Sequence, residues 1–263
     1  MRITKRVLEA VLVVALSVAP AAASERHFTY TYESGVLSPG AREIEPWSTF
    51  RLGRSDSYSR FDSRIETELG LTDRLQTALY LNLKAVTADT PLGRSSSTEL
   101  EGISSEWKLK LADPVADRAG AALYGELSAG PSEFELEGKL ILDKRAGRLL
   151  GALNLVAEHE WKLDAPETEQ ETAFEVDAAA CWFLTRALTA GLEIRSHTVW
   201  LPGEEPARSA LFLGPTVSYA QHGWWVAASV LPQVRALAGA SDGHLDLEEH
   251  ERVEVRVLFG LEF

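Results

Sequence analysis

The sequence has 263 residues, of which 45% are hydrophobic and 25% are charged, and its formal net charge is −13. Such an acidic chain argues against a nucleic-acid partner, which would require a basic face. The single cysteine, Cys181, excludes an internal disulfide framework.

Residues 1–24 have the pattern of a secretory signal peptide. A basic start (Arg2, Lys5 and Arg6) precedes a short apolar stretch and a run of small residues that offers a cleavage site. The apolar stretch is too short for a stable spanning helix. Removing this segment takes away three bases and one acid, which changes the formal charge from −13 to −15. We therefore expect an exported chain and exclude residues 1–24 from the fold.

Residues 25–41 are expected to form a periplasmic lead or a partial plug. The stretch 28–33 alternates apolar and polar residues, and counting it as a strand would give an odd total. Because Gly35–Gly40 has the composition of a turn, we do not count 28–33 as a strand.

From residue 42 onward, apolar and polar residues alternate with period two in about twelve segments. In the segment 60–71, for example, Phe61 and Ile65 share one face while Arg60 and Arg64 share the other. Many segments reach the roughly 9–11 residues that a tilted strand needs to cross a bilayer. A soluble β-sandwich has shorter strands and could not place so many charges in its core. The alternation therefore predicts an all-β fold, an antiparallel up-and-down transmembrane β-barrel spanning residues 42–263.

The expected connections differ in length at the two ends of this barrel. Short turns are predicted at 70–74 and 221–223, and longer polar loops at 88–98 and 238–249. Transmembrane barrels have short periplasmic turns and longer outer loops, so both termini are expected in the periplasm.

Tryptophans and prolines give mixed support to this scheme. Six tryptophans near expected strand ends fit the aromatic girdles of a membrane barrel: Trp47, Trp107, Trp161, Trp182, Trp200 and Trp224. Pro46, Pro215 and Pro232 fall inside expected strands, where each removes a backbone donor and indicates a bulge or a strand end.

The last segment, Val253–Phe263, alternates strictly and ends on an aromatic residue. In this respect residues 42–263 resemble bacterial outer-membrane β-barrels of an uncharacterised, twelve-stranded family, whose final strand typically ends in a phenylalanine that the assembly machinery reads. The resemblance implies outer-membrane lipid and the barrel-assembly machinery as partners, with Phe259, Leu261 and Phe263 as the assembly signal. We expect a monomer. No catalytic motif of barrel enzymes matches, so no catalytic residue is transferred.

The polar face of the strands is expected to line a water-filled lumen. Glutamates and aspartate of three successive later strands should form an acidic patch, and arginines and lysines of four early strands a basic patch. The lumen-lining candidates are Arg51, Arg60, Arg64, Glu66, Lys84, Lys108, Lys110, Glu133, Glu135, Glu137, Glu158, Glu160, Glu175, Asp177, Glu193, Arg195 and Arg256.

Catalytic and metal sites are weakly indicated. Ser196 and His197 are adjacent, but neighbours on a strand point to opposite faces and cannot act as nucleophile and base without a bulge. His244 and His250 lie in a carboxylate-rich stretch whose spacing fits no common metal site, so a solvated acidic loop is the preferred interpretation. We expect no enzyme activity, no metal and no cofactor.

The leading functional hypothesis is passive passage of small polar or charged solutes through an outer-membrane channel. Two alternatives remain open: a non-conducting structural or surface-interaction barrel, and a lipid-modifying enzyme. The size of a twelve-stranded barrel does not decide between them, because it lies between packed eight-stranded barrels and open sixteen-stranded porins.

Overall fold

The computed structural model describes residues 25–90, 93–163, 169–200 and 208–263. Within these ranges no helix is long and apolar enough to cross a membrane. The same ranges contain twelve strands: β1 (Arg42–Leu52), β2 (Tyr58–Gly70), β3 (Leu75–Thr90), β4 (Gly93–Ala112), β5 (Gly120–Ala129), β6 (Glu133–Ala146), β7 (Leu149–Lys162), β8 (Glu169–Phe183), β9 (Leu188–Trp200), β10 (Arg208–Gln221), β11 (Trp224–Ala238) and β12 (Val253–Glu262).

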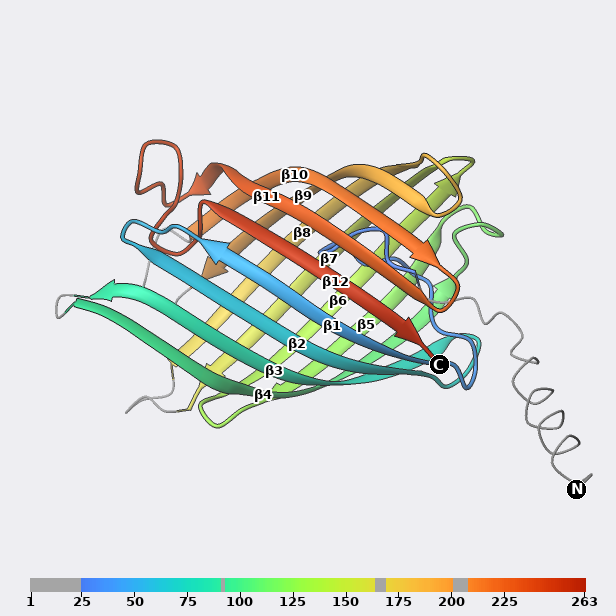
Figure 1. Ribbon diagram of the computed structural model, residues 1–263, viewed down its shortest axis with the longest axis horizontal. Coiled ribbons are helices and arrows are strands. Elements are labelled where there is room, and N and C mark those ends of the chain that lie inside the picture. The colour runs from blue at the N-terminus through green and yellow to red at the C-terminus, as the bar shows by residue number, and fades with distance from the viewer. Residues whose placement is uncertain (1–24, 91–92, 164–168, 201–207) are drawn as a thin grey trace, which may run out of the picture.

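Each strand pairs antiparallel with its neighbours in the chain, and β1 also pairs with β12, so the sheet closes into a barrel (Figure 1). Closure satisfies the backbone groups that an open sheet edge would expose, which lipid cannot hydrogen-bond. The predicted fold class is confirmed. The strand number is twelve, because residues 28–33 do not join the sheet.

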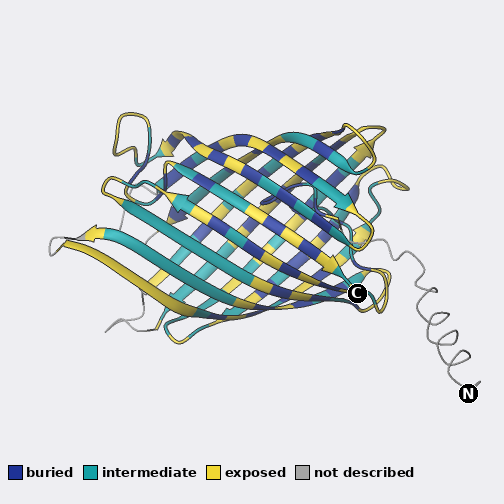
Figure 2. Ribbon diagram, in the orientation of Figure 1, coloured by how far each residue is buried: buried dark blue, intermediate teal, exposed yellow. Residues whose placement is uncertain are grey.

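Side chains alternate between an apolar outer surface and a polar interior. In β1, Ile44 and Phe50 point outward and are exposed, whereas Glu43 and Glu45 are buried. Figure 2 shows the resulting alternation of buried and exposed residues along the strands. Leu79 and Ile103 on the outer surface are 67% and 63% exposed. This arrangement is the reverse of a soluble protein, and it suits a barrel whose outside contacts lipid.

The prediction of a loop at 88–98 is wrong. Strand β3 continues to Thr90 and β4 begins at Gly93, with Ala88 paired to Ser95 and Asp89 to Arg94. The run Ser95–Thr98 carries no hydrophobic alternation, so the sequence pattern missed it. The backbone nevertheless pairs across this hairpin, which extends beyond the neighbouring strands in Figure 1.

One of the six tryptophans contradicts the girdle prediction. Trp47 points into the barrel and is only 6% exposed, because it shares the inward parity of Glu45 and Thr49 on β1. The Arg26 guanidinium lies 4.7 Å from its ring centre. A position near a strand end therefore did not determine whether this tryptophan faces the lipid or the lumen.

The three prolines lie where pairing is interrupted. On β1, the pairing with β12 passes from Ile44 directly to Trp47, leaving out Pro46. Between β10 and β11, pairing passes from Phe212 to Thr216, so Pro215 and Pro232 face the same gap from opposite strands. Since proline has no N–H to donate, these gaps accommodate it inside the strands.

Residues 25–41 are called the N-terminal segment below, and residues 26–37 of it lie inside the barrel, whereas Ser38, Pro39 and Gly40 form an exposed turn before β1 (Figure 1). The segment occupies the terminal end, where β1 begins and β12 ends; there the Phe263 N–H donates to the Arg42 carbonyl at 3.0 Å. Phe28 and Leu37 of the segment are fully buried. The opposite end of the barrel is called the loop end.

Candidate functional site in the lumen

A cavity of about 490 Å³ lies inside the barrel above the N-terminal segment. Tyr30 and Tyr32 of that segment form part of its lining, and Arg54 and Glu249 line it from connections at the loop end. The N-terminal segment is therefore the floor of the cavity, and the mouth lies at the loop end.

Most of the residues predicted to line the lumen lie around this cavity. Of the seventeen candidates, thirteen line it: Arg51, Arg60, Arg64, Lys84, Glu133, Glu135, Glu137, Glu158, Glu160, Glu175, Asp177, Arg195 and Arg256. Glu66, Lys108 and Glu193 also point inward but are buried outside the cavity lining, and Lys110 is half-buried near the terminal end.

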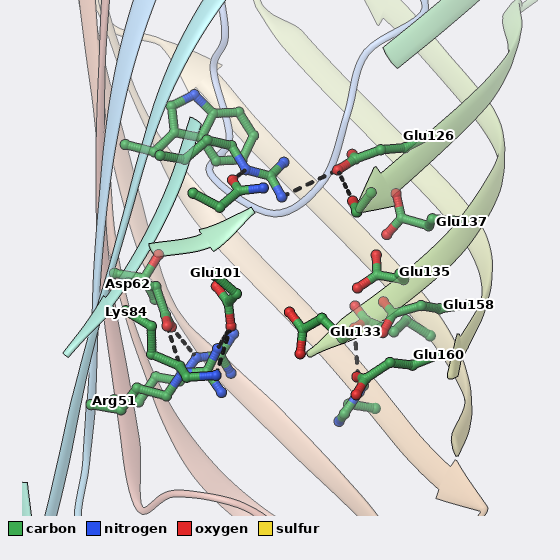
Figure 3. Close-up of a pocket in the computed structure, with 18 of the residues that line it drawn as sticks. Arg51, Asp62, Lys84, Glu101, Glu126, Glu133, Glu135, Glu137, Glu158 and Glu160 are labelled. Atoms are coloured by element: carbon green, nitrogen blue, oxygen red, sulfur yellow. Dashed lines mark hydrogen bonds and ion pairs between the residues drawn. The ribbon is translucent and has the colours of Figure 1, made fainter. Parts of the chain in front are cut away.

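Figure 3 shows the carboxylates of β6 and β7 facing a cluster of paired charges across the cavity. We call Glu133, Glu135, Glu137, Glu158 and Glu160 the acidic wall. Glu135 is paired in register with Glu160, and Glu137 with Glu158, so like charges stand opposite each other on neighbouring strands. Two cations make ion pairs with it: Lys139 approaches Glu137 at 2.9 Å, and Lys162 approaches Glu160 at 3.9 Å.

The opposite side is not the basic patch that the sequence predicted. Arg51 pairs with Asp62 at 2.9 Å and with Glu254 at 2.8 Å. Lys84 lies 3.0 Å from Glu101, which Arg60 also approaches at 3.2 Å. Arg51, Arg60 and Lys84 are thus present on this side, but each is in contact with a carboxylate.

Counting the residues that line the cavity in the described ranges gives thirteen carboxylates and nine lysines and arginines. The excess of four negative charges is concentrated at the acidic wall, because the cations of the opposite side already have partners.

A chain of polar side chains in hydrogen-bond or charge contact connects the mouth to the lumen. His250 lies 2.9 Å from Asp246 through Nδ1 and 3.0 Å from His197 Nδ1 through Nε2. His197 Nε2 is 3.5 Å from Glu175, which binds Arg195 at 2.6 Å. Burial by itself would raise the pKa of Asp246, but the hydrogen bond and charge of His250 outweigh it and hold that pKa below its ordinary value.

The interpretation of residues 243–251 as a solvated acidic loop is therefore wrong in part. Asp246, Leu247, His250 and Glu251 are buried because the connection folds back over the mouth, although His244 remains exposed. Gln233 secures this fold by bonding the Asp246 backbone at both its N–H and its carbonyl. The sequence could not show that His250 meets a residue 53 positions away.

The floor is attached by backbone hydrogen bonds to lumen side chains. The N–H groups of Thr29, Tyr30 and Thr31 all donate to the carboxylate of Glu193, at 2.9–3.1 Å. Asn154 exchanges two hydrogen bonds with the backbone of Tyr32. A segment without strand partners thus has its backbone donors satisfied inside the barrel.

An ion pair closes a turn within the same segment. Burial alone would lower the pKa of His27, but the Glu33 carboxylate 2.8 Å away outweighs this effect and raises it above its ordinary value. Burial would raise the pKa of Glu33, and His27 in turn holds it below its ordinary value. Both shifts favour the charged pair.

Sequence reasoning omitted several residues that make this site. Glu101, Glu126, Lys139 and Glu254 all make ion pairs inside the barrel. The inward parity of Glu126, Lys139 and Glu254 was available from the pattern of alternation. Glu101 has the parity of the outward Ile103 and turns inward only because the pairing of β3 and β4 skips it, from Gly102 to Leu100. The pairing partners of all four were not available from the sequence, because these depend on register and side-chain reach. Ser196 is absent from the cavity lining, and His197 is turned to His250.

The closed barrel with its outward aliphatic residues and charged lumen defines the class: an outer-membrane-type β-barrel. The chain belongs to a family of unknown function (DUF6662), whose model matches residues 20–263. No curated protein sequence matches it.

Solved structures with the same architecture include an outer membrane channel from Pseudomonas putida F1, at a TM-score of 0.63 and 12% identity over 88% of this chain and 98% of that one. The β domain of the Bordetella autotransporter BrkA gives 0.54 and 10% identity over 86% and 100%. The NanC porin gives 0.51 and 9% identity over 83% and 98%. At these identities the likeness is one of fold.

Proposed function

We propose that this protein is an outer-membrane channel for small cationic solutes, with both termini on the periplasmic side. The observation that carries the proposal is the charged cavity inside the barrel, with thirteen carboxylates against nine lysines and arginines. The aliphatic outer surface supports a membrane location, and similar barrels include an outer membrane channel and a porin.

The preference for cations rests on where the uncompensated charge lies. A wall of one sign with a low-dielectric surround raises the local concentration of the opposite ion. Arg51, Arg60 and Lys84 project little positive field, because each is in contact with a carboxylate. The acidic wall has fewer partners, so it sets the sign of the potential in the cavity.

Passage through this barrel requires the floor to move. The N-terminal segment occupies the terminal end with fully buried side chains at Phe28 and Leu37. The channel is therefore closed while the segment is seated on Glu193 and Asn154, and it opens when the segment shifts. Discrete openings, rather than a steady current, are the expected behaviour.

A second candidate function is a non-conducting barrel that meets a partner at its outer surface. Two observations favour it: the floor fills the terminal end, and residues 239–252 fold back over the mouth. In this case the acidic wall would be an interior charge network without transport.

Planar bilayer recordings of the purified full chain in a KCl gradient test the proposal. We expect discrete openings with a reversal potential that indicates cation preference. The double variant Glu135→Gln/Glu158→Gln should move the cation-to-anion permeability ratio toward one, because it removes two charges from the acidic wall. Asp73→Asn, which changes an exposed carboxylate in the turn between β2 and β3 at the terminal end, is the control and should leave the ratio unchanged. A protein that never shows discrete conductance would support the second candidate instead.

A further inference from the structure

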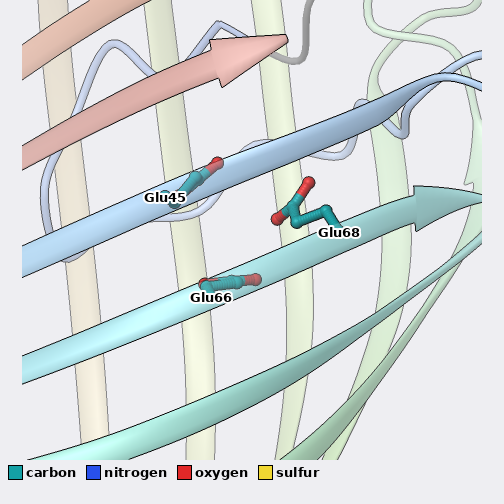
Figure 4. A group of neighbouring side chains, drawn as sticks. All are labelled: Glu45, Glu66 and Glu68. Carbon is teal, nitrogen blue, oxygen red and sulfur yellow. The ribbon is translucent and has the colours of Figure 1, made fainter. Parts of the chain in front are cut away.

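A second group of carboxylates lies near the terminal end, apart from the cavity. Glu45 on β1 and Glu66 and Glu68 on β2 each offer one oxygen, and these three oxygens lie within 4.8 Å of one another. Glu45 and Glu66 are directly paired across the two strands, so both point to the same side of the sheet. Figure 4 shows the three side chains together on the inner face of the strands.

The group is buried and incompletely satisfied. Glu66 is 1% exposed, and neither of its carboxylate oxygens has a hydrogen-bond partner in the described part of the chain. By contrast, Glu45 accepts a hydrogen bond from the Trp47 indole at 2.9 Å, and Glu68 accepts one from Gln76 at 2.6 Å. A buried carboxylate without donors is costly unless a positive charge or a proton compensates it.

The nearby protein cations do not balance the negative charge. Arg26 acts on Glu45 and Glu66, Arg64 also acts on Glu66, and Lys108 acts on Glu68. Against these three positive charges stand five carboxylates: the three of the cluster, Glu43 on β1, which acts on Glu45, and Glu106 on β4, which acts on Glu66. Both oxygens of Glu106 and one of Glu43 have no hydrogen-bond partner in the described part of the chain. A divalent cation would bring this set to neutrality.

We propose that Glu45, Glu66 and Glu68 form a calcium site inside the barrel, beside the N-terminal segment. Calcium accepts several carboxylate oxygens at about 2.3–2.6 Å in flexible geometry. Magnesium demands near-ideal octahedral geometry and gives up its water reluctantly, which suits a buried three-carboxylate group poorly. A bound ion would link β1 to β2 next to the buried Arg26 side chain. It goes beyond the proposed channel function and does not depend on it.

Trp47 provides a built-in reporter for this site. Its indole is hydrogen-bonded to Glu45, so a luminescent calcium substitute bound there would lie close enough to receive energy from the excited ring. Terbium(III) is such a substitute, since it also prefers carboxylate oxygens. The acidic wall gives an internal comparison, because it contains carboxylates and lies across the barrel from β1 and β2.

The experiment refolds the full mature chain in detergent with terbium present, so that access to the buried site does not limit binding, and excites tryptophan. We expect one bound ion with sensitised emission, displaced by calcium at far lower concentration than by magnesium. Glu66→Gln should weaken binding at least 10-fold, and Trp47→Phe should lower the emission at saturating terbium, because it removes the ring that absorbs the exciting light. Glu160→Gln in the acidic wall is the control and should leave the emission unchanged.

Folding of each variant is checked by its heat-dependent mobility shift on a gel, and Glu45→Gln serves if Glu66→Gln does not fold. Emission that is absent, or that persists unchanged in both folded variants, would overturn the proposal and show that the carboxyl groups are neutralised by shared protons. Because conductance is not measured, this result is independent of the channel test.

Discussion

At the scale of single residues, Glu193 is the side chain that holds the N-terminal segment in place. Its carboxylate accepts three successive backbone N–H groups and the Thr29 hydroxyl, and its side chain is fully buried. Hydrogen bonds to a charged acceptor are each worth about 1.5–3 kcal/mol. No other single side chain among the described residues accepts so many bonds from this segment.

Glu193→Gln should loosen the floor without unfolding the barrel. The amide would present a donor where N–H groups now point, which destabilises the seated segment by about 1–3 kcal/mol. Hydrogen exchange of the amides at 29–31 should then be roughly 10-fold faster or more, since 1.4 kcal/mol corresponds to a factor of ten. Glu99→Gln changes an exposed glutamate on β4, so it serves as the control and should leave the exchange of these amides unchanged. Unchanged protection at these amides would show that the segment is held by packing instead.

Only some of these residue-level features could be predicted from the sequence. Parity along each strand predicted that Glu193 and Arg195 face the interior, and both side chains are buried. It could not reveal that Glu193 binds a segment more than 160 positions earlier, or that Asp62 and Glu101 neutralise the arginines of β1 and β2. Such contacts depend on register across several strands and on a segment with no regular structure.

At the scale of elements, the contact between β10 and β11 is unusually close near their prolines. Pro215 and Pro232 leave a gap in the pairing, and Gly214 lies in the same gap. A Cβ at Gly214 would overlap the carbonyl oxygen of Val230. Glycine therefore permits the two backbones to approach where regular pairing is interrupted.

Gly214→Ala should destabilise the barrel, because the added methyl group must push the strands apart. We expect a loss of about 1–3 kcal/mol, as for other overpacked sites. The measurement is the urea concentration at which the folded band is lost after reconstitution in lipid. Gly151→Ala is the matched control: it lies on β7, and its added Cβ would be 3.8 Å from the nearest atom, the Ala179 carbonyl oxygen. Equal stability of the two variants would show that the gap can widen at no cost.

The strands themselves were largely predictable. Period-two alternation predicted about twelve strands and the side that faces outward, because a barrel wall repeats the same contrast from strand to strand. The alternation was poor over residues 210–220, which form most of β10. The pattern failed at Ser95–Thr98, where small polar residues pair through their backbones, and at Trp47, where a large aromatic turns inward to contact Arg26.

At the scale of the whole molecule, the fold and the contents of its lumen have different origins. The closed sheet follows from the alternation of apolar and polar residues and from the order of the hairpins. Both features can be predicted from short stretches of the sequence. Filling of the terminal end follows from the N-terminal segment, whose residues make long-range bonds to β7 and β9. The boundary of that segment near residue 41 and its role as a plug remain predictions.

The central claim is that the N-terminal segment must move for the channel to conduct, and a reversible tether tests it most directly. The hydroxyl oxygens of Thr29 and Ser229 on β11 are 2.5 Å apart. The variant Thr29→Cys/Ser229→Cys, made with Cys181→Ala, would join the floor to the barrel wall by a disulfide bond. Thr189→Cys/Ser218→Cys joins β9 to β10 at a similar oxygen separation of 2.6 Å and leaves the floor free.

In planar bilayers the oxidised floor tether should show no openings, and reduction with dithiothreitol should restore them, while the β9–β10 tether conducts in both states. If the oxidised floor tether conducts as well as the reduced protein, then the segment does not gate the lumen and the account of this barrel as a floor-gated channel is contradicted.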